Sequence, residues 1–323
     1  MLNQLPLTFL LSFCRDKIPG KGEDSFCYSF CDSAGMLGVF DGCGGAGART
    51  HAYYSGKTEA YMASRLCAGA FYDLFRMHYP EQQDTAAFVR DVLQPGTLEQ
   101  LSRFQPPKVP GTIQIRGSMV RTLPSTAAAA IVQAQDDGSV KVGAIWAGDS
   151  RVYILDGRGL AQLTVDDATV TDPMLNIYED GILKNIFCSD RAMHLNYREV
   201  VVKPPFMVLA ASDGCYGYVT TPMEFEGLLL RTLLASKNVA HWEQILADAI
   251  GSFAGDDHAM CLAAFGYEGF DELKYSFNER TMHLWNTYIQ PVENLPAEQR
   301  EPRFALWEMY KQDYLRYLKD GQI

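Results

Sequence analysis

Basic residues are scarce in this chain of 323 residues, in which 28 Lys and Arg stand against 39 Asp and Glu, giving a formal net charge of −11. Nucleic acids and anionic membrane surfaces attract proteins with basic patches, so we expect neither a nucleic acid nor a membrane as a partner. The charge does not argue against a metal-dependent enzyme, because bound cations would meet the phosphate of a substrate.

Long apolar runs and closely paired cysteines are also lacking. The apolar segment 5–13 is too short to span a bilayer, and it has neither a basic region before it nor a convincing cleavage site. We therefore expect it to be the first strand of a cytoplasmic protein. The eight cysteines include no CxxC pair, and Cys27, Cys67 and Cys261 lie within apolar runs. This pattern predicts buried free thiols in a reducing compartment and argues against a zinc site.

Carboxylates, by contrast, stand at the ends of four predicted strands. Any one of them is also typical of a simple turn, since Asp-Gly is common in hairpins. Strand ends that converge on one edge of a sheet would instead form an oxygen-rich site, and oxygen ligands favour Mg²⁺ or Mn²⁺ over zinc. The four positions are Glu23-Asp24, Asp41-Gly42, Asp213-Gly214 and Asp256-Asp257.

The order of the predicted elements indicates an α+β protein, because its helices are segregated from antiparallel strands. Short turns separate the four runs between residues 126 and 164, which predicts an antiparallel meander that the run 259–265 closes. Residues 166–195 show no clear period and predict a surface flap. Strands are predicted over 5–13, 25–31, 36–40, 126–132, 140–147, 151–155, 160–164, 200–202, 206–211 and 259–265, and helices over 56–75 (limited by Pro80), 85–93, 97–104, 223–234 and 241–254.

The character of the chain changes after residue 266. We predict a domain over residues 1–266 and a helical C-terminal extension over 267–323. Apolar and aromatic residues recur at helical intervals in this extension, which predicts a stripe that packs on the domain or on a partner and is not a ligand site. The stripe consists of Phe304, Leu306, Trp307, Tyr310, Tyr314, Leu315 and Leu318.

Seven short motifs follow one another in an order that resembles the metal-dependent protein serine/threonine phosphatases of type 2C (the PPM family). They span about residues 20–265 and are Gly22-Glu-Asp24, Val39-Phe-Asp-Gly-Cys-Gly-Gly45, Ser125-Thr-Ala127, Ala147-Gly-Asp-Ser-Arg151, Leu163-Thr-Val-Asp166, Ala211-Ser-Asp-Gly214 and Gly255-Asp-Asp257. The resemblance implies an αββα sandwich, in which two antiparallel sheets are flanked by helices. The extension after residue 266 lies outside the resemblance.

The resemblance also implies a site with two Mn²⁺ or Mg²⁺ ions. Asp41 would bridge both ions, and Asp41, Asp213 and Asp257 would be essential for catalysis. Two ions about 4 Å apart lower the pKa of a bridging water and clamp the phosphoryl oxygens, so no protein nucleophile is needed. The implied metal ligands are Glu23, Asp24, Asp41, Gly42 through its carbonyl, Asp213 and Asp257, with Asp149 helping a weaker third ion or only building the turn 148–150.

Thr126 would support the metals, and His258 would either hydrogen-bond a ligand or act as an acid for the leaving alkoxide. The family usually grips the substrate phosphate with an arginine at the position that Pro19 occupies here. We expect Lys21, or else Arg15, to take that role, although a lysine offers a point charge where arginine offers a bidentate fork.

The expected function is therefore the hydrolysis of phosphoserine and phosphothreonine in a phosphorylated protein substrate, opposed by a cognate Ser/Thr kinase. One alternative is a catalytically weak or silent relative that binds phosphoproteins or other partners. A second alternative is a hydrolase of a small phosphorylated metabolite.

Overall fold

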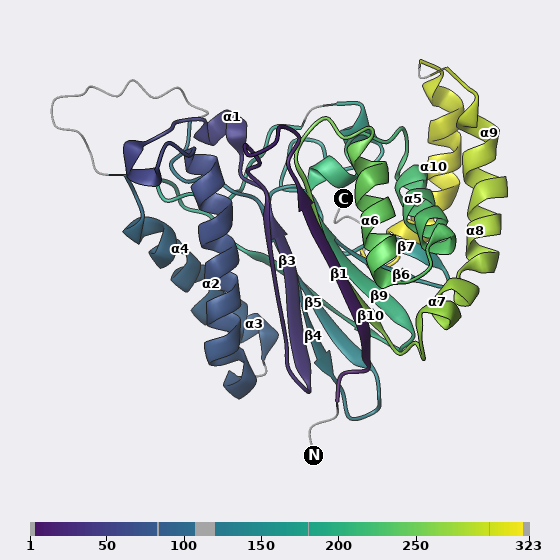
Figure 1. The fold of residues 1–323 in the computed structure, drawn as a ribbon, viewed down its shortest axis with the longest axis horizontal. Helices are drawn as coiled ribbons and strands as arrows, with labels where there is room; N and C mark the ends of the chain where they lie inside the picture. Colours follow the sequence, from purple (N-terminus) through teal and green to yellow (C-terminus); the bar gives the residue numbers. More distant parts are fainter. Residues whose placement is uncertain (1–3, 83, 107–119, 180, 297, 319–323) are drawn as a thin grey trace.

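The computed structural model describes residues 4–82, 84–106, 120–179, 181–296 and 298–318. Two five-stranded antiparallel sheets lie face to face, and helices cover the outer face of each sheet (Figure 1). The predicted α+β sandwich with αββα layers is thereby confirmed. Among the described residues, no helix combines the length and the apolar character that a membrane crossing needs.

The strands of both sheets follow the predicted apolar runs closely. The first sheet has the order β1 (Leu7–Arg15), β10 (His258–Phe265), β9 (Phe206–Ala211), β6 (Arg151–Asp156) and β7 (Gly159–Gln162). The second has the order β2 (Ser25–Phe30), β3 (Ala34–Phe40), β4 (Ala127–Ala134), β5 (Val140–Ala147) and β8 (Asn196–Val202). Every residue of β3, β9 and β10 is buried, because each of these strands has a sheet on one face and helices on the other.

The four runs between residues 126 and 164 do not form a single meander, and this prediction was wrong. β4 pairs with β5 in one sheet, whereas β6 pairs with β7 in the other, so the turn 148–150 crosses from sheet to sheet. β10 does not close a meander either, because it lies between β1 and β9. An apolar run that is buried on both faces identifies a strand, but it carries no information about which strand lies beside it.

The helices on the second sheet come from one stretch of the chain. α2 begins at Glu59, three residues later than predicted, and it continues to Gln82, past Pro80. The predicted helices over 85–93 and 97–104 form one helical stretch that contains a π-helical segment, Val89–Leu93. The remaining elements here are α1 (Gly44–Gly47), α3 (Thr85–Phe88) and α4 (Gln94–Arg103).

The helices on the first sheet come from the second half of the chain. Trp307, Tyr310 and Tyr314 are almost completely buried and share a core with Tyr153 of β6 and Trp242 of α6. The aromatic stripe therefore packs on the domain, while the boundary at residue 266 stays a prediction. The elements are α5 (Pro222–Ala235), α6 (Val239–Gly251), α7 (Phe270–Ser276), α8 (Asn278–Leu284), α9 (Gln290–Glu293) and α10 (Arg300–Tyr314).

Candidate metal centre

Asp41 is the first residue after β3, and the loop that follows it is held firmly. The Asp41 carbonyl accepts hydrogen bonds from the backbone N–H of Thr126 at 2.8 Å and from the Ser125 hydroxyl at 2.9 Å. A Cβ atom at Gly42 would lie 2.4 Å from the Ala60 carbonyl oxygen, so only glycine fits there. The end of β3 thus has a fixed position against β4 and α2.

Asp213 stands two residues after β9, at a second tight junction. The neighbouring Ser212 hydroxyl donates to the buried carboxyl group of Asp24 at 2.7 Å, which ties the end of β9 to the beginning of β2. A Cβ atom at Gly214 would lie 1.8 Å from the Asp257 carbonyl oxygen. The absence of a side chain at Gly214 therefore lets the loop after β9 touch the loop before β10.

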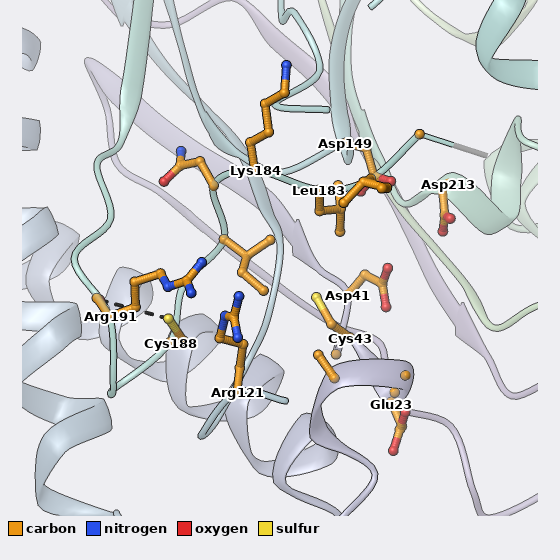
Figure 2. Close-up of a pocket in the computed structure, with 18 of the residues that line it drawn as sticks. Glu23, Asp41, Cys43, Arg121, Asp149, Leu183, Lys184, Cys188, Arg191 and Asp213 are labelled. Carbon is orange, nitrogen blue, oxygen red and sulfur yellow. Dashed lines mark hydrogen bonds between the residues drawn. The ribbon is translucent and has the colours of Figure 1, made fainter. Parts of the chain in front are cut away.

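These strand ends meet at one cavity of about 580 Å³, which is open to solvent (Figure 2). Asp41, Asp149 and Asp213 reach it from the ends of β3, β5 and β9, and Figure 2 shows their carboxylates pointing into the same space. Of the other predicted site residues, Glu23, Gly42 and Asp257 also line the cavity, and Asp24 lies behind it, in contact with Asp41.

The carboxyl groups are crowded enough to disturb one another's ionisation. Burial raises the pKa of Asp24 to about 8, and the charge of Asp213 adds to this effect. Burial and the neighbouring Asp24 and Asp149 raise the pKa of Asp41 well above its ordinary range. Burial also raises the pKa of Asp149 to about 6. Carboxyl groups in such a cluster favour a bound proton or a bound cation.

The donor set fits a hard divalent cation. Its members are carboxylate and carbonyl oxygens, which suit Mg²⁺ and Mn²⁺. One carboxylate oxygen of Asp149 is buried and has no hydrogen-bond partner among the described residues, as expected of an atom that awaits a cation. As the side chains stand, no group of three or more His, Cys, Asp or Glu in the described ranges could jointly hold an ion.

Two of the predicted ligands, Asp257 and Glu23, accept hydrogen bonds from other groups of the protein. The Asp257 carboxylate accepts hydrogen bonds from the backbone N–H groups of Lys17 and Glu23, both at 2.7 Å. The Glu23 carboxylate accepts a hydrogen bond from the Thr58 hydroxyl. Asp257 therefore anchors the loop 17–23 in this structure, and its role as a metal ligand stays a prediction.

Asp256 is the neighbouring carboxylate that reasoning from sequence did not single out. It lines the cavity, and its charge contributes to the raised pKa of both Asp41 and Asp213. The charge of Asp257 contributes to the raised pKa of Glu23 and Asp24. The position of the pair Asp256-Asp257 before a predicted strand indicated a site residue, but the sequence did not indicate which of the two acts on Asp41.

The two predicted supporting residues differ in their placement. The Thr126 hydroxyl is buried at 2.7 Å from that of Ser150, so it joins the loop after β5 to the beginning of β4. His258 is buried beside Phe13, its ring centroid 6.2 Å from that of Phe13, and it does not line the cavity. Burial lowers the pKa of His258, so its position gives no support to a role as an acid for the leaving group.

The predicted phosphate-binding residues, Arg15 and Lys21, do not line the cavity. The cations that do line it are Arg121, Lys184 and Arg191. Reasoning from sequence missed them because two lie in the stretch 166–195, which has no periodic pattern, and the third follows a segment rich in proline.

Comparison with known proteins is informative at the level of structure. No family model matches the sequence, and neither does any curated protein. The serine/threonine phosphatase PstP of Mycobacterium tuberculosis superposes with a TM-score of 0.54 at 16% identity, covering 81% of this chain and 100% of that one. The serine/threonine phosphatase Stp1 of Staphylococcus aureus gives a TM-score of 0.58 at 18% identity, covering 82% and 98%.

A second structure of the PstP catalytic domain was solved in complex with two manganese ions, and it matches with a TM-score of 0.52 at 16% identity, covering 80% of this chain and 98% of that one. The chain therefore has the fold of the bacterial PP2C-type serine/threonine phosphatases. Identities this low show the fold alone.

Proposed function

We propose that this protein is a metal-dependent protein serine/threonine phosphatase of the PP2C type. The observation that carries the proposal is the meeting of Asp41, Asp149 and Asp213, from three separate strand ends, at one cavity. This cavity occurs in a fold shared with serine/threonine phosphatases, one of which was solved with two manganese ions. The substrate would be a phosphorylated protein, and a cognate Ser/Thr kinase would oppose the reaction.

The residues that would hold two Mn²⁺ or Mg²⁺ ions are those with oxygen atoms at or behind the cavity wall. Asp41 would be the shared ligand, because it contacts Asp24 and also lies within reach of the negative charge of Asp149. When bound, the ions supply an activated water and clamp the phosphoryl oxygens. The other candidates are Glu23, Asp24, Gly42 through its carbonyl, Asp149, Asp213 and either Asp256 or Asp257.

The rest of the cavity wall orients the substrate and limits its access to water. Ile182, Leu183 and Ile186 contribute apolar side chains to this wall. Leu183 is partly buried, whereas Ile182 is 64% exposed. Such a wall suits the carbon chain of a phosphorylated residue, while the charged end of the cavity receives its phosphate.

A phosphoprotein-binding role without catalysis is the second candidate. The observation that favours it is the Asp257 carboxylate, both of whose oxygens are satisfied by backbone N–H groups. A carboxylate held in this way is a weaker metal ligand, because the two N–H donors compete with an ion for the charge and lone pairs of its oxygens.

Phosphate release from a phosphothreonine peptide, measured with and without Mn²⁺, tests the proposal. We expect release that depends on Mn²⁺. A protein that binds the peptide but releases no phosphate supports the silent relative instead. High activity on a small phosphorylated metabolite with little on phosphopeptides would assign the site to the metabolite hydrolase.

A further inference from the structure

We propose that Arg121 and Arg191 bind the phosphoryl group of the substrate, in place of the cation that is missing at position 19. This inference rests on the proposed function, because it names the residues that hold the substrate at the same cavity. It replaces the expectation that Lys21 or Arg15 performs this task.

The cavity has two chemically different ends. Carboxylates occupy one end, and Arg121 and Arg191 lie on its other side. In Figure 2 both guanidinium groups point into the cavity from the side opposite Asp213, with Cys43 and Asp41 between them and Asp213. The Lys184 ammonium points away from the carboxylates in the same view. A dianion placed between the two ends would meet metal ions on one side and two guanidinium groups on the other.

Backbone contacts hold the two arginines on one wall. The backbone N–H of Arg121 donates to the Ala46 carbonyl at 3.1 Å, which ties Arg121 to the glycine-rich loop after Asp41. The next residue, Thr122, donates its backbone N–H to the Asp190 carboxylate at 3.1 Å. Because Asp190 directly precedes Arg191, this contact holds two segments that are about 70 residues apart in the sequence side by side at the site.

Guanidinium chemistry suits the phosphoryl group. A guanidinium stays charged at every physiological pH, and its planar fork can donate two parallel hydrogen bonds to phosphate oxygens. Arg191 is exposed, so a bound anion would gain its charge at little cost in desolvation. Arg121, whose Nη1 also donates to the Val120 carbonyl at 2.9 Å, and Arg191 approach from different segments, so they can address different oxygens of one phosphoryl group.

The loop 15–21 contacts the site through a backbone N–H group, and none of its charged side chains lines the cavity. Lys17 donates its backbone N–H to Asp257 and its ammonium to the Ala254 carbonyl, so this lysine is committed to the loop before β10. Neither Arg15 nor Lys21 reaches the cavity wall. The two arginines thus lie where a phosphate-binding cation is required.

Steady-state kinetics of Arg121→Ala, Arg191→Ala and the double variant in Mn²⁺ provide the test. Three substrates separate the contributions: p-nitrophenyl phosphate, a phosphothreonine peptide with neutral flanks and one with acidic flanks. We expect KM to rise about tenfold for each single variant and further for the double variant, to a similar extent on all three substrates. Arg121→Lys and Arg191→Lys keep the charge and lose the fork, so they should give intermediate values.

Arg90→Ala is the matched control, because Arg90 is an exposed arginine whose partner is the adjacent Asp91. A loss confined to the acidic-flank peptide would mean that the arginines bind flanking carboxylates, which overturns the proposal. A larger rise in KM for Lys21→Ala than for Arg121→Ala would also overturn it.

Binding of inorganic phosphate, measured by calorimetry, separates this inference from the proposed function. We expect the double variant to bind phosphate about tenfold or more weakly than the wild type. Equal affinities would overturn the arginine assignment even in an active enzyme. If the wild type releases no phosphate from any substrate, the proposed function fails, while the difference in phosphate affinity still decides the role of the arginines.

Discussion

The carboxyl group of Asp41 lies against that of Asp24, and Asp149 adds a further negative charge. Such a group contributes unfavourably to folding unless a proton or a cation compensates it. The same crowding makes it a strong site for a divalent ion. Replacing such a carboxylate is therefore expected to impair function and, in the metal-free protein, to leave stability unchanged or raise it.

For Asp41→Asn we expect phosphate release to fall to background while the metal-free protein unfolds at the same or a higher temperature. The amide removes a negative charge from the cluster, and it also removes the ligand that both ions would share. A phosphate-release assay and a thermal unfolding curve measure the two effects. Asp73→Asn, at an exposed position on α2, is the control. Wild-type activity in Asp41→Asn would exclude this site.

Asp256 and Asp257 allow a comparison of adjacent carboxylates. We expect Asp256→Asn to weaken Mn²⁺ binding more than Asp257→Asn does, since it is Asp256 whose charge acts on Asp41 and Asp213. Asp257→Asn should instead lower stability by about 1 kcal/mol, because an amide can accept only one of the two hydrogen bonds from Lys17 and Glu23. Titration calorimetry with Mn²⁺ and chemical unfolding distinguish the two outcomes, and the reverse order would make Asp257 the ligand.

The metal-free protein should lose stability as the pH rises. The pKa of Asp24 is raised from 3.8 to about 8, so between these values the folded state holds a proton that the unfolded state has lost. Stability is therefore greatest below about pH 4 for this group and declines toward pH 8. Unfolding free energies in EDTA from pH 5 to pH 8 measure the decline. Added Mn²⁺ should stabilise the protein most at the upper end, and a stability that rises with pH in EDTA would contradict this account.

Among the elements, the loop between β3 and α2 shows how glycine permits the site to form. The backbone of Gly42 lies against Ala60 and Glu23, so the loop after Asp41 is pressed onto the N-terminal turn of α2. At Gly45, three residues later in α1, an added Cβ atom would meet no other atom within 4 Å. A side chain is therefore excluded at Gly42, whereas there is room for one at Gly45.

Gly42→Ala should destabilise the protein by several kcal/mol, because its Cβ would lie 2.4 Å from the Ala60 carbonyl oxygen and backbone atoms cannot yield cheaply. Gly45→Ala should be neutral or stabilise by up to about 1 kcal/mol, since alanine is the better helix former. Chemical unfolding of both variants measures the difference. Equal stabilities would show that the loop can move away from α2.

Reasoning from sequence located the strands of this fold well and their neighbours poorly. Apolar runs closed by Asp-Gly identified the ends of β3 and β9, and with them Asp41 and Asp213. Nothing in the sequence indicated that the chain passes from β5 in one sheet to β6 in the other, because both strands are largely buried on both faces. Arg121 and Arg191 could not be found, since their placement depends on contacts between distant irregular segments such as Thr122 with Asp190.

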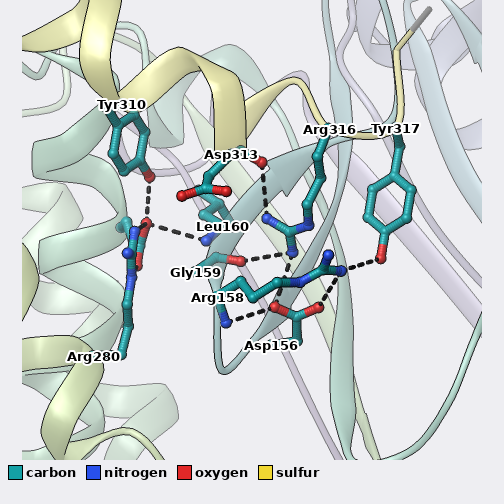
Figure 3. A network of polar contacts seen from close by, with 10 residues as sticks. Asp156, Arg158, Gly159, Leu160, Arg280, Tyr310, Asp313, Arg316 and Tyr317 are labelled. Atoms are coloured by element: carbon teal, nitrogen blue, oxygen red, sulfur yellow. Dashed lines mark hydrogen bonds and ion pairs between the residues drawn. The ribbon is translucent and has the colours of Figure 1, made fainter.

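For the molecule as a whole, the C-terminal extension contributes polar contacts as well as aromatic packing (Figure 3). Arg280 of α8 forms a buried ion pair with Glu226 of α5 at 2.6 Å, and Tyr310 of α10 donates to the same carboxylate. Arg316 pairs with Asp156 at the end of β6 at 3.0 Å. These contacts fasten the extension to α5 and to the edge of the first sheet.

Arg280→Met should lower the unfolding free energy by about 3–5 kcal/mol, because the Glu226 carboxylate would remain buried without its partner. Arg90→Met, at an exposed pair with Asp91, should change it by less than about 1 kcal/mol. Denaturant titrations of both variants test the contrast. A loss of equal size in the two would mean that the extension is not held through Glu226.

Trp307 and Tyr314 pack in the same core as Leu11 of β1, so the first strand and the last described helix complete one interior together. During synthesis on the ribosome, that interior cannot close until α10 has emerged from the exit tunnel. The acidic cluster is therefore complete in the nascent chain, once Asp257 has been made, before the scaffold around it is finished, and the candidate site takes its final form only when α10 docks.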